Sequence, residues 1–333
     1  MDLSTTYLGL RLPNPLVIGA SPLCDDLDMV RRLEDAGAAA IVMHSVFEEQ
    51  LTREREHTAA ALAAHVDAFA EASSFLPRPA EFHLAPDEYL EQIRRIRAAV
   101  AMPVIGSLNG VTAAGWLDHA KRIQDAGASA LELNVYYIAS DPGEDAAQVE
   151  RRTLDIVRSV KRAVAIPIAV KLSPSFSALS HFARELEAAG ADGLVLFNRF
   201  YQPDIDIAAL EIRPVHHASD PSELPLRLRW LAILSGQRAR LDFAATGGVH
   251  DAHDVIKAVM AGAHAVQLVS ALLVHGPQHL RTVHDNVART LDELGYASVA
   301  EMRGCMNLAR CPDASALERA NYVRVLHSWR DKP

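Results

Sequence analysis

The chain is short of cysteine, of aromatic residues and of net positive charge. Three of its 333 residues are cysteines and 6% are aromatic, while 33 lysines and arginines stand against 42 aspartates and glutamates. Cys24, Cys305 and Cys311 show no disulfide or metal spacing, so we expect free thiols in a reducing compartment. The net charge of −9 leaves no electrostatic footprint for binding nucleic acid.

Long apolar runs are missing as well. No run approaches the roughly 18 residues of a membrane-spanning helix. Residues 1–6 carry an acid and no basic segment, unlike a signal peptide. Because half of the residues are apolar and 23% are charged, the composition is typical of a folded globular protein. These patterns exclude disorder and predict a cytoplasmic protein without a membrane partner.

A short phrase recurs along the chain. A helical pattern ends in alanine–glycine–alanine, and a short apolar run follows. The glycines of this phrase are Gly37, Gly127, Gly190 and Gly262. Glycine just past a helix supplies the left-handed conformation that ends the helix and turns the chain into the next strand. The repeat therefore predicts an alternation of helices and strands.

Apolar segments with few charges are typical of parallel strands that are covered on both faces. The expected strands are residues 16–20, 39–45, 104–109, 130–134, 168–172, 194–198, 242–246 and 265–270. Eight strands alternating with helices predict an α/β fold of the TIM (β/α)8 barrel type, with residues 1–333 as one domain. A doubly wound sheet is the alternative, but no Gly-x-Gly-x-x-Gly follows the first strand.

Two connections are longer than usual: residues 48–87 after the second strand, with a helix expected over 58–73, and residues 201–234 after the sixth. Both leave from the carboxyl ends of strands, where barrel active sites are built. Long connections of this kind serve as lids or binding loops, or as peripheral packing or dimer elements.

Asparagine ends three of the expected strands, at Asn109, Asn134 and Asn198. Each amide offers two donors and an acceptor, which suits a flat heterocycle, although a single asparagine could also cap a turn. Lys171 ends the fifth strand. It could form a salt bridge, hold an anionic ring by its charge, or act as a Schiff-base nucleophile.

The ends of the last two strands predict a phosphate site. Paired glycines let main-chain N–H groups approach phosphate oxygens, and barrels commonly build phosphate sites from these two loops. A serine–glycine pair before the seventh strand could add donors. The residues expected at the phosphate are Ser235, Gly236, Thr246, Gly247, Gly248, Val269 and Ser270.

In this order the motifs resemble the dihydroorotate dehydrogenase family, and its class 1 branch most closely. The resemblance runs from Leu8 to Pro277. It rests on Gly19-Ala20-Ser21, Ser45, Leu133-Asn134, the segment 170–174, Thr246-Gly247-Gly248 and the segment 266–270. The resemblance implies an FMN-dependent oxidoreductase that oxidises dihydroorotate to orotate in pyrimidine biosynthesis, or oxidises a related planar acid. It also implies a homodimer.

The same resemblance implies roles for individual residues, with FMN lying across the barrel mouth. Ala20 and Ser21 would touch the edge of the flavin ring, and Asn134 and Lys171 its polar side. Asn109, Asn134 and Asn198 would face the substrate. Further expected cofactor contacts are His44, Ser45, Asn109 and the phosphate-site residues named above.

Two positions depart from the family pattern. The family carries a cysteine or serine base on the loop after the fourth strand, where this chain has Tyr137. Tyr137 could be the base, Ser140 could replace it, or the loop could lack a base. His44 stands where the family usually has lysine. Its imidazole could contact the flavin or substrate, or only fill the space.

Three functions remain open at this point: the FMN-dependent oxidoreductase, a flavin-free barrel lyase that uses Lys171, and a flavin-binding protein that has lost dehydrogenase activity. The electron acceptor could be fumarate, NAD through a partner, or oxygen. No metal site is expected, because His250 and His253 have no third ligand nearby.

Overall fold

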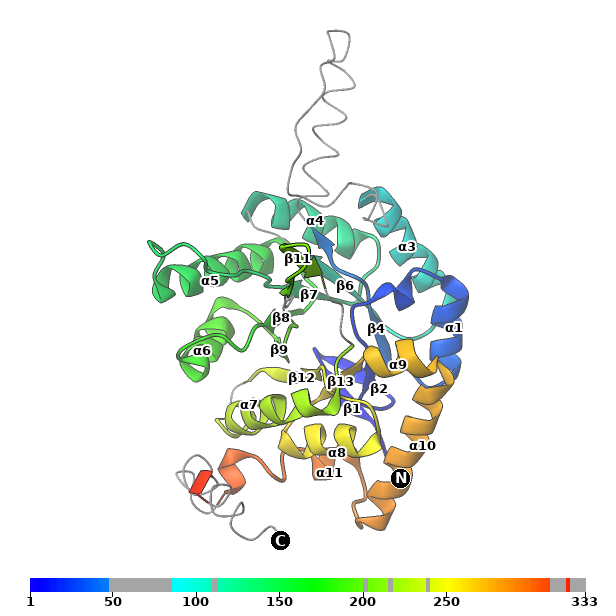
Figure 1. Cartoon of the computed structure of the whole chain (residues 1–333). Coiled ribbons are helices and arrows are strands. Elements are labelled where there is room, and N and C mark those ends of the chain that lie inside the picture. The colour runs from blue at the N-terminus through cyan, green and yellow to red at the C-terminus, as the bar shows by residue number, and fades with distance from the viewer. Residues whose placement is uncertain are drawn as a thin grey trace.

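Eight parallel strands form a closed barrel in the computed structural model, which describes residues 1–47, 86–109, 113–199, 203–214, 218–237, 240–311 and 322–323 (Figure 1). The barrel strands are β3 (Leu16–Ile18), β4 (Ala40–Val42), β6 (Val104–Asn109), β7 (Ala130–Asn134), β8 (Ile168–Leu172), β9 (Gly193–Leu196), β12 (Asp242–Thr246) and β13 (Ala265–Leu268). β13 pairs with β3, and β4 pairs with β6, so the sheet closes on itself. The TIM-barrel prediction is confirmed.

Helices surround the barrel (Figure 1). They are α1 (Leu27–Asp35), α3 (Pro86–Ala99), α4 (Ala113–Asp125), α5 (Ala146–Ala163), α6 (Leu179–Ala189), α7 (Leu224–Gly236), α8 (Ala252–Ala261), α9 (Ser270–His275), α10 (Gln278–Glu293) and α11 (Val299–Met302). The four repeated glycines have φ between +100° and +119°, which confirms that each ends a helix. Short 3-10 turns lie at η1 (Pro22–Cys24), η3 (Pro221–Glu223) and η4 (Leu308–Arg310).

The barrel strands are buried along almost their whole length, as expected for strands covered on both faces. Their buried side chains include polar ones, and three of these, Glu132 on β7, Lys171 on β8 and Gln267 on β13, lie between apolar neighbours within a strand. Buried charges are rare unless they are paired, so these side chains point to a polar site inside the barrel.

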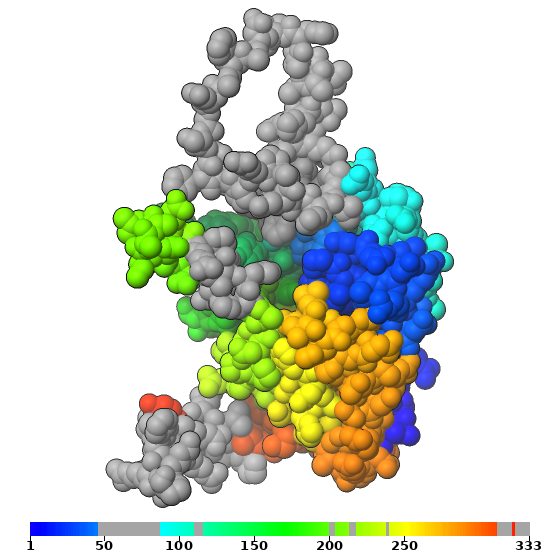
Figure 2. Space-filling model, turned by 45° about the vertical axis from the view of Figure 1, so that its right-hand side comes forward, coloured from blue at the N-terminus to red at the C-terminus, as the bar shows by residue number. Residues whose placement is uncertain are grey.

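The connection after β9 contains an antiparallel hairpin, β10 (Pro203–Asp206) and β11 (Glu211–Pro214), followed by η3 and α7. Figure 2 shows the hairpin standing out from the body of the molecule. Its aliphatic side chains are largely exposed, with Ile207 and Leu210 each 86% accessible.

The other long connection lies outside the described residues except for its last two, which belong to α3, so the helix expected over 58–73 is untested. Among the described residues no helix is long and apolar enough to cross a membrane.

A second hairpin, β1 (Thr5–Tyr7) and β2 (Leu10–Leu12), closes the amino-terminal end of the barrel. Tyr7, Leu8 and Leu12 are buried in one cluster with inward-facing alanines and valines of the strands. The Leu8 N–H donates to Asp242 Oδ2 at 2.7 Å, at the first residue of β12. With this end plugged, a ligand that reaches the barrel interior enters from the carboxyl ends of the strands.

His264 lies at the plugged end. Its Nδ1 accepts the backbone N–H of Phe243 at 3.1 Å, and its Nε2 lies 3.2 Å from Asp242 Oδ1. Nδ1 is committed as an acceptor, so the ring is neutral. Burial, with a smaller contribution from the charge of Arg303, lowers the pKa of His264 from 6.5 to about 3.

This buried imidazole predicts a pH-dependent stability. In the unfolded chain, His264 binds a proton below its ordinary pKa of 6.5. In the native state, it binds this proton only below about pH 3. The free energy of unfolding should therefore fall as pH decreases through this window, by up to about 1.4 kcal/mol per pH unit from this group. Urea unfolding between pH 7 and pH 5 measures the slope. His264→Asn, whose amide oxygen can accept the Phe243 N–H, should show a shallower slope; equal slopes would contradict the assignment.

Candidate active site at the barrel mouth

A cavity of about 150 Å³ lies at the carboxyl ends of the strands, between β9, β12 and β13. Its lining is Ala20, Lys171, Phe197, Asn198, Arg199, Ser219, Thr246, Gly247, Val249, Gln267, Val269 and Ser270. Six of the residues expected to contact a cofactor are therefore brought together: Ala20, Lys171, Thr246, Gly247, Val269 and Ser270. Asn198, expected to contact the substrate, joins them.

The loops after β12 and β13 form a cradle of small and hydroxylic residues. Gly247 and Gly248 have φ of +85° and +78°, and a Cβ on Gly248 would lie 2.6 Å from the backbone nitrogen of Leu224. The Ser219 N–H and hydroxyl both donate to Ser270 Oγ at 2.9 Å. His250 Nε2 lies 2.7 Å from the Ser219 carbonyl oxygen and holds this loop in place. Backbone that approaches this closely, with small polar side chains, suits a phosphate group.

Ser235 and Gly236 do not reach the cradle, which corrects their expected role. They end α7, whereas Leu224 at the start of α7 lies against Gly248. A helix of this length separates its two ends by about 18 Å. The Ser235 hydroxyl donates to the Ala261 carbonyl oxygen, and Gly236 packs against η4. The cradle instead uses Ser219, on the segment that leads into α7.

A chain of hydrogen bonds joins polar side chains across the mouth. Asn198 donates to Asn134 Oδ1, Asn134 donates to Ser45 Oγ at 3.1 Å, and Ser45 Oγ lies 2.7 Å from Ser107 Oγ. Asn109 is also buried, and its Nδ2 has no hydrogen-bond partner among the described residues. A buried amide without a partner is costly, so Asn109 has a donor available for a ligand carbonyl.

Lys171 and Glu132 form an ion pair inside the barrel. Lys171 Nζ lies 3.2 Å from Glu132 Oε1, and Gln267 Nε2 donates to Glu132 Oε2 at 2.6 Å. Both charged side chains are at most 10% accessible. Of the roles considered for Lys171, the structure shows the salt bridge. The pair also fixes the ammonium group at the mouth, where the lysine lines the cavity.

The loop after β7 carries Tyr137 on the wall of a larger cavity of about 870 Å³. The Tyr137 hydroxyl donates to Glu144 Oε2 at 2.6 Å. Arg152 pairs with Glu144 and places its guanidinium 4.4 Å from the centre of the tyrosine ring. Ser140 is exposed and is not among the residues described as lining this cavity. Tyr137 is therefore the better placed of the two candidate bases.

Arg199 belongs to both cavities and connects them. Its Nε lies 3.1 Å from Glu223 Oε1, and Glu223 also pairs with Arg227 at 3.0 Å. Arg227 is buried and donates to the Thr246 carbonyl oxygen at 3.0 Å. Burial lowers the pKa of the Arg227 guanidinium, and Glu223 opposes this effect. Two arginines share one glutamate, so Arg199, Glu223 and Arg227 together carry a net positive charge that suits an anionic ligand, while Glu144 and Glu150 line the same larger cavity.

Ser21 and His44 turn away from the cavity. The Ser21 hydroxyl donates to the Gly19 carbonyl oxygen at 3.0 Å. The His44 imidazole lies 2.8 Å from Asp25 Oδ1 and packs edge-on against the Tyr89 ring. These contacts are those of a side chain that packs beside the mouth, and they favour packing over contact with a flavin as the role of His44.

Several polar side chains at the mouth are absent from the sequence-based predictions: Glu132, Glu144, Arg199, Ser219, Arg227 and Gln267. Glu132 and Gln267 carried a readable signal, since each is polar within an otherwise apolar strand. The sequence contains no comparable signal for Arg199, Ser219 and Arg227, because their positions depend on the path of a long connection.

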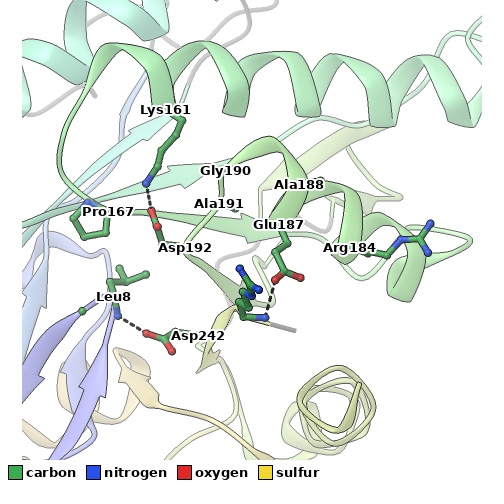
Figure 3. A pocket seen from close by; sticks show the side chains of 12 residues that line it. Leu8, Lys161, Pro167, Arg184, Glu187, Ala188, Gly190, Ala191, Asp192 and Asp242 are labelled. Atoms are coloured by element: carbon green, nitrogen blue, oxygen red, sulfur yellow. Dashed lines mark hydrogen bonds and ion pairs between the residues drawn. The ribbon is translucent and has the colours of Figure 1, made fainter. Parts of the chain in front are cut away.

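A third cavity, of about 690 Å³, lies at the opposite end of the barrel (Figure 3). Its carboxylates have partners within the lining: Asp192 pairs with Lys161, and Asp242 and Glu187 accept the backbone N–H groups of Leu8 and Arg240. Neither the strand-end asparagines nor the glycine cradle is among its lining residues. The candidate active site therefore lies at the mouth of the barrel.

Known proteins are similar to this chain over most of its length. The family model described as dihydroorotate dehydrogenase matches residues 2–291. The catalytic subunit of dihydroorotate dehydrogenase B (NAD(+)) from Thermoplasma acidophilum is 29% identical over 311 residues, covering 91% of this chain and 98% of the relative. The dihydropyrimidine dehydrogenase subunit PreA (NAD-dependent) from Escherichia coli is 23% identical over 343 residues, covering 97% of this chain and 80% of the relative. The chain belongs to the dihydroorotate dehydrogenase family, whose members are flavin-dependent oxidoreductases acting on CH–CH bonds.

Proposed function

We propose that this protein is an FMN-dependent dehydrogenase that oxidises dihydroorotate to orotate. The observation that carries the proposal is the buried Asn109 Nδ2, which has no hydrogen-bond partner within the part of the chain that the structure describes, beside the hydrogen-bonded Asn134 and Asn198. Three amides at one mouth match the alternating carbonyl and N–H groups of a pyrimidine ring. Arg199 supplies a positive charge for the substrate carboxylate, between the two cavities.

FMN is the flavin that the cradle favours. A cavity of about 150 Å³ is too small for a whole flavin but suits its phosphate end. The fit rests on Gly247 and Gly248, whose missing side chains let the segment around Asp220, Leu224 and Arg227 lie directly against the loop after β12. Ser219 and Ser270 add hydroxyl groups. The flavin ring would extend from the cradle towards Lys171.

A bound flavin supplies the acceptor for the hydride that leaves one carbon of the substrate. The protein must remove the proton from the neighbouring carbon. Tyr137 can take this proton if its own hydroxyl proton passes to Glu144, which accepts its hydrogen bond at 2.6 Å. Lys171, which lines the cavity at the mouth, would hold positive charge beside a bound flavin and favour negative charge on it.

The substrate proposal is tested by anaerobic reduction of the purified protein. Flavin absorption should bleach on addition of dihydroorotate. Dihydrouracil, which lacks the carboxylate, is the matched comparison and should react at least about tenfold more slowly if Arg199 holds the carboxylate, since 1.4 kcal/mol corresponds to tenfold. A faster reaction with dihydrouracil would assign the protein to neutral dihydropyrimidines. Flavin that neither compound reduces would contradict the dehydrogenase proposal.

Removal of the Lys171 charge should affect both folding and cofactor. Lys171→Ala leaves Glu132 buried without its cation, so we expect a loss of about 3–5 kcal/mol in the free energy of unfolding, together with weaker flavin binding. The double variant Lys171→Met/Glu132→Gln removes both charges and should recover most of the stability but not the flavin affinity. Thermal unfolding and flavin content measure the two effects. Recovery of both would show that Lys171 acts only through folding.

A flavin-free lyase is the competing function, and the Lys171–Glu132 pair weighs against it. The ion pair commits the amine to a carboxylate rather than to a substrate carbonyl. Purified protein without flavin bands, together with a borohydride-trapped adduct on Lys171, would establish the lyase. A homodimer stays a prediction of the family resemblance, and a cytoplasmic location and a single domain over residues 1–333 stay predictions of the sequence patterns. The electron acceptor stays open among fumarate, NAD through a partner, and oxygen.

A further inference from the structure

Three potential metal ligands converge beside the barrel mouth, outside the cradle. Cys24 ends η1, Asp25 follows it, and His44 lies two residues beyond β4. Cys24 Sγ lies 3.5 Å from His44 Nδ1 and 3.5 Å from Asp25 Oδ1, and the latter two atoms are 2.8 Å apart. The cysteine is buried, while the aspartate opens to solvent.

The contacts of the His44 ring nitrogen favour a metal site over a catalytic triad. In a cysteine–histidine–aspartate triad the imidazole contacts the thiol through one ring nitrogen and the carboxylate through the other. Here Nδ1 of His44 faces both Cys24 Sγ and Asp25 Oδ1. One nitrogen shared by two potential anions cannot relay a proton between them, but all three atoms can face one cation.

The three distances also match a tetrahedral zinc ion. With bonds of about 2.3 Å to sulfur and about 2.0 Å to nitrogen and oxygen, tetrahedral ligands lie about 3.5 Å apart for each sulfur pair and about 3.3 Å apart for the nitrogen–oxygen pair. Both sulfur distances agree with the observed 3.5 Å. Only the 2.8 Å distance between His44 and Asp25 must widen, and the exposed carboxylate can move.

Surrounding groups hold the ligands in place. The His44 backbone N–H donates to Cys24 Sγ at 3.2 Å, which favours a thiolate ligand. Gln92 Nε2 donates to the carbonyl oxygens of Cys24 and Asp25 at 3.0 and 3.1 Å, and the Tyr89 ring packs against the imidazole. Such outer contacts orient metal ligands.

Without a metal, the thiol keeps its proton. Cys24 Sγ lies 3.2 Å from the Ser21 carbonyl oxygen, which accepts the S–H, and burial raises the pKa of the thiol. A metal ion would displace that proton on binding.

We propose that Cys24, Asp25 and His44 bind one zinc ion, with water as the fourth ligand. A cysteine–histidine–carboxylate set suits a borderline-soft divalent ion better than magnesium or calcium. The ion would tie the turn after β3 to the end of β4, next to Ser45, whose hydroxyl supports Asn134. The proposal does not depend on the substrate or the flavin. It departs from the sequence-based expectation of no metal, because residues 24 and 44 meet only in the folded chain.

The test is zinc binding by the intact protein. Protein stripped with a chelator is dialysed against zinc chloride, and its metal content is measured by mass spectrometry and its coordination by zinc K-edge X-ray absorption. We expect about one zinc per chain, with one sulfur at about 2.3 Å and lighter ligands at about 2.0 Å. Cys24→Ser should lose the sulfur scatterer. Asp25→Asn, an exposed change that spares folding, should weaken zinc affinity by about 100-fold or more.

Matched controls are Cys305→Ser for the cysteine variant and Asp28→Asn for the aspartate variant, and both should bind zinc like the wild type. Absence of bound zinc would overturn the proposal. Zinc bound without sulfur, or bound equally well by Cys24→Ser and Asp25→Asn, would overturn it too.

Discussion

Tyr137→Phe should slow the reduction of the flavin by dihydroorotate by about 100- to 10,000-fold, the range typical of losing a general base. The hydroxyl is the only group removed, and its hydrogen bond to Glu144 provides the route for the proton. Flavin content should stay unchanged, because Tyr137 lines the larger cavity and not the phosphate cradle. Anaerobic stopped-flow measurement of the absorption change gives the rate.

Two loop variants serve as controls for that result. Ser140→Ala should reduce at nearly the wild-type rate, since Ser140 is exposed away from the cavity lining. Tyr136→Phe removes a hydroxyl from the neighbouring position and should also have little effect. Glu144→Gln, in contrast, should slow reduction in the same direction as Tyr137→Phe. A slow Ser140→Ala and a fast Tyr137→Phe would move the role to Ser140, and two fast variants would show that the loop supplies no base.

Gly248→Ala should yield protein that has lost most of its flavin, with affinity lowered at least about tenfold, equivalent to 1.4 kcal/mol. The added Cβ would lie 2.6 Å from Leu224 N and 3.1 Å from Asp220 O. Both are backbone atoms of the segment around η3, so relief requires that segment to shift. Ser219 on the same segment would then lose its contact with Ser270. Absorbance of the flavin relative to protein measures the loss.

Gly295→Ala is the matched control. Gly295 has φ of +77°, close to the +78° of Gly248, but no atom lies within 4 Å of its Cβ position. Both alanines suffer the same backbone strain of about 1–2 kcal/mol, and only Gly248→Ala adds the clash. Equal flavin content in the two variants would show that the loop after β12 does not form the cofactor site.

The barrel was predictable because its signals are local. Each helix-ending glycine and each apolar run reports on its own neighbourhood, so the strand positions follow without knowledge of the tertiary structure. Residues 130–134 are predicted with the same bounds that β7 has in the structure. The strand-end asparagines and Lys171 followed from the rule that carboxyl ends meet at one mouth.

The errors and omissions at the site have physical causes. Ser235 and Gly236 precede a strand, and connections that precede strands lie at the amino-terminal end of the barrel; the rule that placed Lys171 would have excluded them. Ser219 and Arg199 could not be placed, because each belongs to the long connection between β9 and α7, whose path the local sequence does not determine. The direction of the Tyr137 hydroxyl depends on Glu144 and Arg152.

The hairpin that plugs the barrel bears on how the chain reaches its native state. Thr5 Oγ1 donates to a carbonyl oxygen 259 residues later and accepts from Arg303, 298 residues later. The Leu8 N–H donates across 234 residues. Contacts of such long sequence separation form late and slow folding. During synthesis, residues 5–8 leave the ribosome more than 200 residues before their partners Asp242, His264 and Arg303, and the apolar Tyr7 and Leu8 stay accessible to chaperones until the barrel closes around them.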